Sequence, residues 1–294
     1  MSANNNYICA CPTTAPKLYI WQRELLFLAT TRSRYRAHRS VQEKLILCLE
    51  GSLSVQLADG SRVHTGSCLV PTGVEIDDDT INISNTVIAI CFLAPFSQDY
   101  PALASLMTAV APGVYIDHPN EQELIQTLLQ VRDGPELPPD ETYDLTRTRI
   151  IPPDVSNLVF RQFDQRVLEV ARILSSTISE NLTLGELADT VNLSESRLEK
   201  LFKDQAGIPI TQYRLRYRLF VGALLLAQGH SVTDAALAAG FSNSAHFSRS
   251  YSATNGLAPS TTFLKPPYLK TFVDEKVLAS MAGILNTQTD DNPV

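Results

Sequence analysis

The chain has 294 residues, of which 44% are hydrophobic and 19% charged, with a formal net charge of −7 at pH 7. These values indicate about two folded domains with sizeable cores. No run approaches the roughly 18 apolar residues of a transmembrane helix, which argues against an integral membrane protein. The N-terminal sequence MSANNNYICACPTTAPK has neither a basic start nor an apolar run, so we expect no signal peptide and a cytoplasmic location.

The charge is unevenly distributed along the chain. Residues 1–160 hold eleven basic and eighteen acidic side chains, residues 161–270 hold twelve and nine, and residues 271–294 hold one and four. Taken alone, the acidic total argues against a nucleic-acid partner. The positive balance of residues 161–270 keeps such a partner open.

The five cysteines fall into two groups. Cys9 and Cys11 form a C-x-C pair that lacks the second half of a metal-binding motif, so a metal or redox role is disfavoured. Cys48, Cys68 and Cys91 lie in apolar runs and read as small core residues. In a reducing compartment we expect free thiols rather than disulfides.

The N-terminal part reads as short β-strands separated by turns. Asp59-Gly60 lies between two of them and predicts a hairpin, because both residues tolerate positive φ. Many short strands of this kind favour a β-sandwich or barrel. The expected strands are Lys17–Thr30, Lys44–Leu49, Ser52–Ala58, Ser61–Thr65, Ser67–Val70, Ile81–Ile83 and Thr86–Leu93.

A helix and a connection follow. Glu121–Arg132 carries an apolar stripe at helical spacing, which either packs on the β-domain or forms a subunit contact. Asp133–Asp154 contains five prolines, each of which lacks an amide hydrogen and fixes φ, so residues 133–163 are expected to be a linker.

Residues 183–263 contain one unit written twice, with an offset that drifts only from 48 to 50 residues. Two copies indicate a tandem pair of small modules rather than a solenoid, which needs about three repeats. The first copy has Ala188, Asn192, Leu198, Phe202, Gly207, Pro209 and Tyr213. The second has Ala236, Gly240, Phe247, Tyr251, Gly256, Pro259 and Phe263.

Each copy has the features of a helix-turn-helix unit. In the first, Thr183–Glu186 is a capping box, Asn192 suits the tight turn, and Ser194 is a good N-cap for the second helix. Pro209 then opens a long helix through Ala227, spanning roughly 27 Å. This is within reach of the ~34 Å turn of B-DNA, so the two units could enter successive major grooves.

The second helix of each unit supplies the side chains expected to face DNA, where Arg and Lys suit guanine or phosphate and Glu suits cytosine. Arg214, Arg216 and Arg218 on the long helix are expected at a solvated surface, with phosphate contact as the alternative. The expected DNA-binding residues are Ser194, Ser196, Arg197, Glu199, Lys200 and Lys203 in the first unit, and Ser244, Ala245, His246, Ser248 and Arg249 in the second.

The second copy, from Ser231 through Ala239-Gly240-Phe241 to Pro259, resembles the signature of the AraC/XylS family of bacterial transcription regulators, and the first copy is similar to it. The resemblance departs from the family after Tyr251, where Ser252 replaces a basic residue. This departure predicts that the first unit dominates DNA binding.

A looser resemblance covers the N-terminal part. Glu50-Gly51 and Gly66–Gly73 are similar to the two motifs of cupin barrels, which implies a small-molecule pocket without identifying its lining. The combined expectation is an α+β protein: an N-terminal cupin-like β-barrel plus a C-terminal all-α domain with two helix-turn-helix units joined by a long helix. The expected parts are a cupin-like effector and dimerisation domain with its terminal helix (1–132), the linker (133–163), an AraC-type DNA-binding domain (164–268) and an acidic tail (269–294).

Metal-binding cupins carry a His-x-His pair with a nearby Glu, and a later His. Here His38 is followed by Ser40 two positions on, Ile76 stands where the later histidine is expected, and Glu43 has only one imidazole nearby in sequence. One imidazole and one carboxylate are too few ligands. We therefore expect no metal, cofactor or catalytic residue, and read His38 and His64 as surface or pocket residues.

The leading hypothesis is a sequence-specific transcription regulator, with an activator as the working assignment. Its expected partners are double-stranded DNA, RNA polymerase, a small-molecule effector and a second copy of the chain. Two alternatives stay open. One is a metal-dependent cupin-type enzyme, which bound metal would favour, and the other is a protein-interaction module that has lost DNA binding. The effector, the target promoters and the sign of regulation do not follow from the residues.

Overall fold

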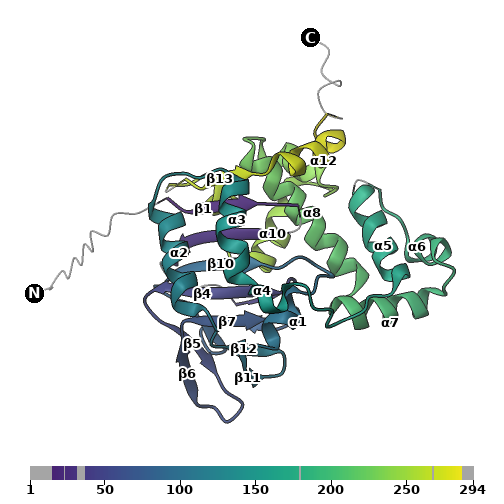
Figure 1. The fold of residues 1–294 in the computed structure, drawn as a ribbon. Coiled ribbons are helices and arrows are strands. Elements are labelled where there is room, and N and C mark those ends of the chain that lie inside the picture. The colour runs from purple at the N-terminus through teal and green to yellow at the C-terminus, as the bar shows by residue number, and fades with distance from the viewer. Residues whose placement is uncertain (1–14, 23, 32–36, 179, 267, 287–294) are drawn as a thin grey trace, which may run out of the picture.

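A computed structural model describes residues 15–286 except 23, 32–36, 179 and 267 (Figure 1). Cys9 and Cys11 lie outside this part of the chain. The N-terminal part is mainly β and the C-terminal part mainly helical, which confirms the α+β prediction. None of the described helices is long and apolar enough to cross a membrane.

The β-part is an eight-stranded sheet in the order β11-β12-β7-β4-β10-β2-β1-β13, with two smaller sheets, β6-β5-β9 and β3-β8. The strands are β1 (Lys17–Ile20), β2 (Leu25–Thr30), β3 (His38–Arg39), β4 (Lys44–Glu50), β5 (Leu53–Gln56), β6 (Arg62–Thr65), β7 (Ser67–Val70), β8 (Glu75–Ile76), β9 (Ile81–Asn82), β10 (Val87–Phe92), β11 (Thr108–Ala111), β12 (Val114–Ile116) and β13 (Lys270–Val273).

The described strands do not close into the predicted barrel. Closure would require the two outermost strands of the large sheet to pair. Instead, the free edge of β1 is occupied by β13 in the only parallel pairing among the described strands, and β11 is the opposite edge. The Asp59-Gly60 hairpin is confirmed between β5 and β6, although only Gly60 adopts positive φ.

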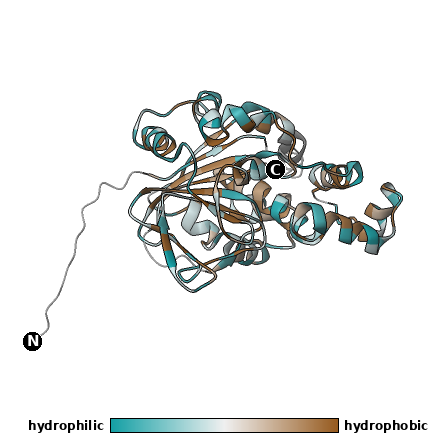
Figure 2. Ribbon diagram, turned by 60° about the horizontal axis from the view of Figure 1, so that its bottom comes forward, coloured by the Kyte–Doolittle hydropathy of each residue, from teal (hydrophilic) through white to brown (hydrophobic). Residues whose placement is uncertain are grey.

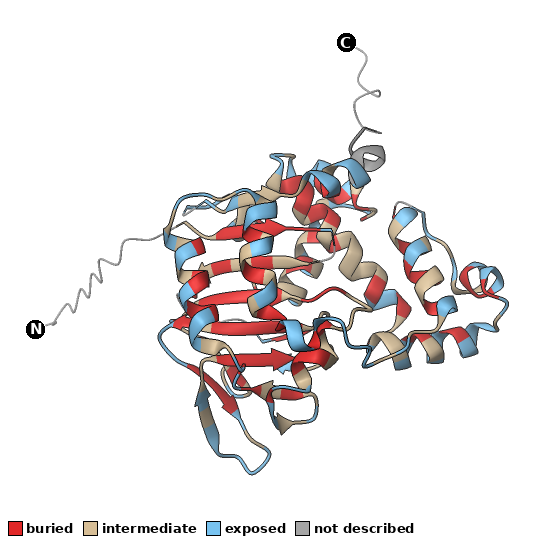
Figure 3. Ribbon diagram, in the orientation of Figure 1, coloured by how far each residue is buried: buried red, intermediate tan, exposed pale blue. Residues whose placement is uncertain are grey.

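Helices cover one face of the large sheet, and Figure 3 shows their buried sides turned toward it. Leu124 and Leu128 of α2 are buried in the core beneath, so the apolar stripe predicted for Glu121–Arg132 is used within the chain. The expected irregular linker contains two helices, and Ile150 and Val155 join the same core. These helices are α1 (Asp99–Ala104), α2 (Glu121–Asp133), α3 (Pro139–Ile150) and α4 (Pro153–Ser156).

The C-terminal helices follow the predicted order, and the long helix α8 lies at their centre (Figure 1). Its predicted start at Pro209 is the N-cap position. The helices are α5 (Gln165–Ser176), α6 (Leu184–Thr190), α7 (Glu195–Ala206), α8 (Ile210–Ala227), α9 (Val232–Ala238), α10 (Ser244–Asn255), α11 (Pro259–Phe263) and α12 (Glu275–Asn286).

The two helix-turn-helix units belong to different cores. Phe202 of α7 lies in a core made by helices α5 to α8, with Phe96 as the contribution of the N-terminal part. Phe247 of α10 lies in a core that also contains Leu18 and Ile20 of the large sheet. In Figure 2 the strands of that sheet are coloured as hydrophobic, as expected for a sheet covered on both faces.

Candidate nucleic-acid interface and interdomain cavity

The first unit, α6 and α7, has the caps that its sequence predicts. The Thr183–Glu186 capping box is complete, and the Ser194 hydroxyl accepts a hydrogen bond from Arg197 N. Asn192 makes the turn at φ 54°, and Gly207 ends α7 at φ 73°. All six residues predicted to face DNA in this unit are exposed, which leaves that side of α7 open to a ligand: Ser194, Ser196, Arg197, Glu199, Lys200 and Lys203.

The second unit, α9 and α10, repeats this frame. Gly240 makes the turn at φ 78°, the Asn243 side chain caps α10 by accepting from His246 N, and Gly256 ends the helix at φ 72°. Helices α7 and α10 are both 12 residues long. Of the predicted DNA-facing residues, Ala245, His246 and Arg249 are exposed, and Ser244 and Ser248 are half-buried.

His246 packs against the core of its own unit and is also exposed. Its ring packs edge-on against Phe241, with centroids 5.3 Å apart, yet the residue remains exposed at the start of α10. Ser242 and Asn243 are exposed beside it and were missed as candidates. Their position before a recognition helix, where the N-cap lies, is the signal that would have found them.

The arginines of α8 do not lie at a solvated surface. Arg214 Nη2 donates to Leu182 O at 2.6 Å, and Arg218 donates to Ile178 O at 3.2 Å and to Asn181 Oδ1 at 2.9 Å. Arg214 and Arg218 therefore hold the α5–α6 connection on α8, which corrects the predicted solvated role.

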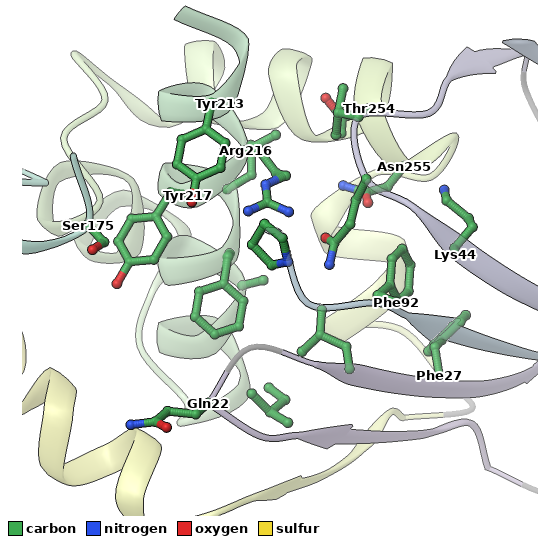
Figure 4. A pocket seen from close by; sticks show the side chains of 18 of the residues that line it. Gln22, Phe27, Lys44, Phe92, Ser175, Tyr213, Arg216, Tyr217, Thr254 and Asn255 are labelled. Atoms are coloured by element: carbon green, nitrogen blue, oxygen red, sulfur yellow. The ribbon is translucent and has the colours of Figure 1, made fainter. Parts of the chain in front are cut away.

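A cavity of about 670 Å³ lies between the large sheet, α5, α8 and α10 (Figure 4). This volume is within the range of small-molecule sites. Most of its wall is apolar, from Ile20 and Phe27 on the sheet side to Leu219 and Phe220 on α8. The cupin resemblance predicted a pocket inside the β-domain, whereas this cavity lies between the two parts of the chain.

Three cations, Lys44, Arg172 and Arg216, line this cavity, and Arg172 is exposed and ion-paired with Glu169. Lys44 is 5% exposed, its Nζ lies 5.1 Å from the centroid of the Phe92 ring, and burial lowers its pKa to about 8. Within the described part of the chain it has no hydrogen-bonded or ion-paired partner. Arg216 points into the cavity from α8 and its Nε is buried without a hydrogen-bond acceptor (Figure 4). Burial also lowers the pKa of Arg216.

Glu43 and Arg216 both line a neighbouring cavity of about 200 Å³. Burial raises the pKa of Glu43 to about 7, although Arg161 and Arg216 act in the opposite direction. Near neutral pH this carboxyl is therefore partly protonated and compensates only part of the positive charge. The two cavities share Gln42 and Phe96 in their walls.

The structure offers no metal site in the part that it describes, because no group of three His, Cys, Asp or Glu side chains could hold an ion there. Ile76 lies directly opposite His38 in the β3–β8 pair and is buried. The position next to this imidazole is thus apolar. His38 is buried, and His64 is hydrogen-bonded to Ser52 at the surface.

Cys68 and Cys91 are buried free thiols and Cys48 is a half-buried one, as predicted.

Comparison with known proteins supports the helix-turn-helix prediction for the helical half of the chain. A family model described as a helix-turn-helix domain matches residues 187–265. The arabinose operon regulatory protein of Escherichia coli is 31% identical over 99 residues, which are 33% of this chain and 34% of that protein. The HTH-type transcriptional regulator GbdR of Pseudomonas aeruginosa is 32% identical over 95 residues. These 95 residues are 32% of this chain and 26% of that protein, so the chain spans about a third or less of the length of these two relatives.

Solved structures extend the likeness to both parts of the chain. ToxT of Vibrio cholerae matches with a TM-score of 0.53 and 12% identity, over 82% of this chain and 97% of that one. An unsaturated fatty acid-bound structure of ToxT matches with a TM-score of 0.51 and 13% identity, over 82% and 95%. At this identity the likeness concerns the fold. Over its tandem helix-turn-helix region, the chain is similar to transcription regulators of the AraC/XylS family.

Proposed function

We propose that this protein is a sequence-specific DNA-binding transcription regulator controlled by a small-molecule effector. The observation that carries this proposal is the pair of matched recognition helices, α7 and α10, which are attached to opposite halves of α8 and carry exposed polar side chains. Phosphate contacts would supply affinity, and the exposed side chains of the two helices would read base edges.

Selection of genomic fragments on the full-length protein would identify its site, and fluorescence anisotropy would then measure affinity at several salt concentrations. The full chain is required because the second unit shares a core with the sheet. We expect log affinity to fall linearly with log salt, with a slope of about −0.9 per neutralised phosphate. A folded protein that selects no fragment and binds no duplex would contradict the proposal and favour a protein-interaction module.

We propose that the effector is an amphipathic anion that occupies the cavity of about 670 Å³. Its acidic group would meet the buried Lys44 and the half-buried Arg216, whose charges are only partly compensated, and its apolar body would cover the aliphatic and aromatic wall. Charge-assisted hydrogen bonds in such a place are strong. The fatty acid named for the ToxT structure has this chemistry, which supports the choice of class.

Oleate and a neutral analogue, oleyl alcohol, test the ligand class by isothermal titration. We expect oleate to bind and Lys44→Met or Arg216→Met to weaken it by about tenfold or more. The control is Lys265→Met, an exposed lysine outside the cavity wall. Equal binding of the acid and the alcohol would contradict an anionic effector.

The remaining partners are also proposals. As an activator, the protein would contact RNA polymerase, and it would act as a homodimer. Because the apolar stripe of α2 is used within the chain, a dimer would have to use a different surface. Light scattering of the protein with and without its DNA site tests the dimer.

A further inference from the structure

Residues 269–280, called here the clasp, join the large sheet to the second helix-turn-helix unit. Their strand, β13, runs parallel to β1. Backbone hydrogen bonds at both ends of this ladder, each 2.9 Å long, join Lys270 N to Pro16 O and Asp274 N to Ile20 O. The clasp lies beyond the residues that match the helix-turn-helix family model. Residues 269–294 were predicted as an acidic tail, without a strand.

The clasp contributes to two cores because side chains alternate between the faces of a strand. Phe272 stacks on Tyr19, with ring centroids 4.6 Å apart, on the face covered by α2 and α3. Val273 and Val277 pack on the other side, against the core that contains Phe247 of α10. The clasp therefore fixes the second unit to the sheet.

The same segment forms part of the cavity wall. Leu269 and Ser280 line it together with Tyr251, Thr254 and Asn255 of α10. Helix α10 also lies beside β3, so one flank of this recognition helix faces the N-terminal part. A helix in the major groove, about 12 Å wide, has a phosphate backbone on each side. With the clasp closed, α10 is held in a position where one flank is covered.

We propose that the clasp is an autoinhibitory strap. Closed, it holds the second unit against the sheet and lowers affinity for DNA; open, it frees α10 to enter the groove. This inference rests on the proposed DNA-binding function. A ligand in the cavity would touch Leu269 and Ser280, and any difference in its affinity for the two states shifts the balance between them.

A disulfide that locks the clasp provides the test. Leu18 and Thr271 are paired in the β1–β13 ladder, and neighbouring strands lie within disulfide range, so Leu18→Cys with Thr271→Cys can be oxidised in place. The full-length protein would also carry Cys9→Ser and Cys11→Ser. We expect the oxidised form to bind the selected duplex about tenfold more weakly than the reduced form. The two forms share the same core substitutions, which controls for lost packing.

Phe272→Ala opens the clasp by a different route, and exposed Tyr268→Ala is its control. We expect faster amide hydrogen exchange in residues 270–273 and higher DNA affinity for Phe272→Ala, and neither change for the control. Equal affinities of the oxidised and reduced forms, with DNA still bound, would overturn the clasp alone. If no form binds DNA, including the parent protein, the proposed function fails with it.

Discussion

The two helix-turn-helix units share one internal frame and differ in what surrounds them. The first contacts its surroundings outside the repeat at two places: Arg161 Nη2, in the connection before α5, donates to Asp204 O at 2.8 Å, and Phe96, between β10 and α1, packs edge-on against Phe202. The second shares a continuous core with the sheet and is joined to it by the clasp. A repeated sequence therefore need not give two equivalent units, because segments outside the repeat decide what each unit packs against.

Their charges also differ, and not simply in favour of the first unit. Helix α7 carries three basic and three acidic residues, whereas α10 carries Arg249 and no acid. With the 49-residue offset of these helices, Lys200 corresponds to Arg249 and Lys203 to Ser252. The dominance of the first unit in DNA binding stays a prediction that these matched positions can test.

The largest effect is expected from the two buried phenylalanines. Phe202→Ala and Phe247→Ala each remove a fully buried ring and should cost about 3–5 kcal/mol of unfolding free energy. Because the first core is separate, Phe202→Ala should unfold the first unit in an early transition. Phe247→Ala should lower the urea concentration at which the sheet unfolds as well as that of the second unit. Urea unfolding followed by hydrogen exchange measures both, and identical exchange patterns would contradict the two-core description.

The next largest effect is expected at the turns of the two helix-turn-helix units. A Cβ at Gly240 would lie 2.7 Å from Ile178 O at a positive φ, so Gly240→Ala should cost about 2–3 kcal/mol. Asn192 already carries a side chain at positive φ, and Asn192→Ala should cost only about 1 kcal/mol. Thermal and urea unfolding measure the loss of unfolding free energy in the two variants. A larger loss for Asn192→Ala would show that the first turn is the more constrained.

DNA contacts give the third comparison. Lys200→Ala and Arg249→Ala should each weaken binding to the selected site by about 1–3 kcal/mol if they contact bases. Anisotropy at several salt concentrations separates the roles, since a lost phosphate contact also reduces the salt slope by about one. A larger loss for Lys200→Ala supports dominance of the first unit, and equal losses count against it. Exposed Lys265→Ala is the control.

The last comparison concerns the pH dependence of stability. The pKa of Glu43 is raised to about 7, so the folded state binds this proton more tightly than the unfolded state does. Its contribution to stability is present in full below the unfolded pKa and is lost as pH rises through about 7. Glu43→Gln should therefore gain stability relative to the parent between about pH 5 and pH 8. A constant difference in unfolding midpoint across this range would contradict the raised pKa.

Local rules predicted the helical half well. Caps such as Thr183 and Ser194, the turn at Gly240 and the ends at Gly207 and Gly256 depend on neighbouring residues, which the sequence displays directly. Most strands of the N-terminal half were predicted for the same reason, including the hairpin at Gly60. The expected strand Lys17–Thr30 is instead the antiparallel pair β1 and β2, and β3, β8, β11 and β12 were not predicted.

The positions of side chains that depend on contacts distant in sequence could not be predicted in the same way. Nothing near Lys44 or Arg216 in sequence shows that both enter one cavity, because that depends on how α8 meets the sheet. Arg218 looked solvated because its acceptors lie in the connection before α6. The prolines at 138, 139, 152 and 153 were read as a linker, yet they occupy the N-cap and first positions of α3 and α4, where a missing amide hydrogen costs nothing.

The pairing of β1 with β13 has a consequence for how the protein is made. The first described strand receives its edge partner from the last described strand, so the sheet stays incomplete while the helical units are being synthesised. Such a distant contact forms late and slows folding. It also means that the helical domain lies, along the chain, inside the sheet domain rather than after it. A chimera that exchanges everything beyond residue 164 would therefore take a strand from the N-terminal sheet, and a working exchange would have to leave β13 in place.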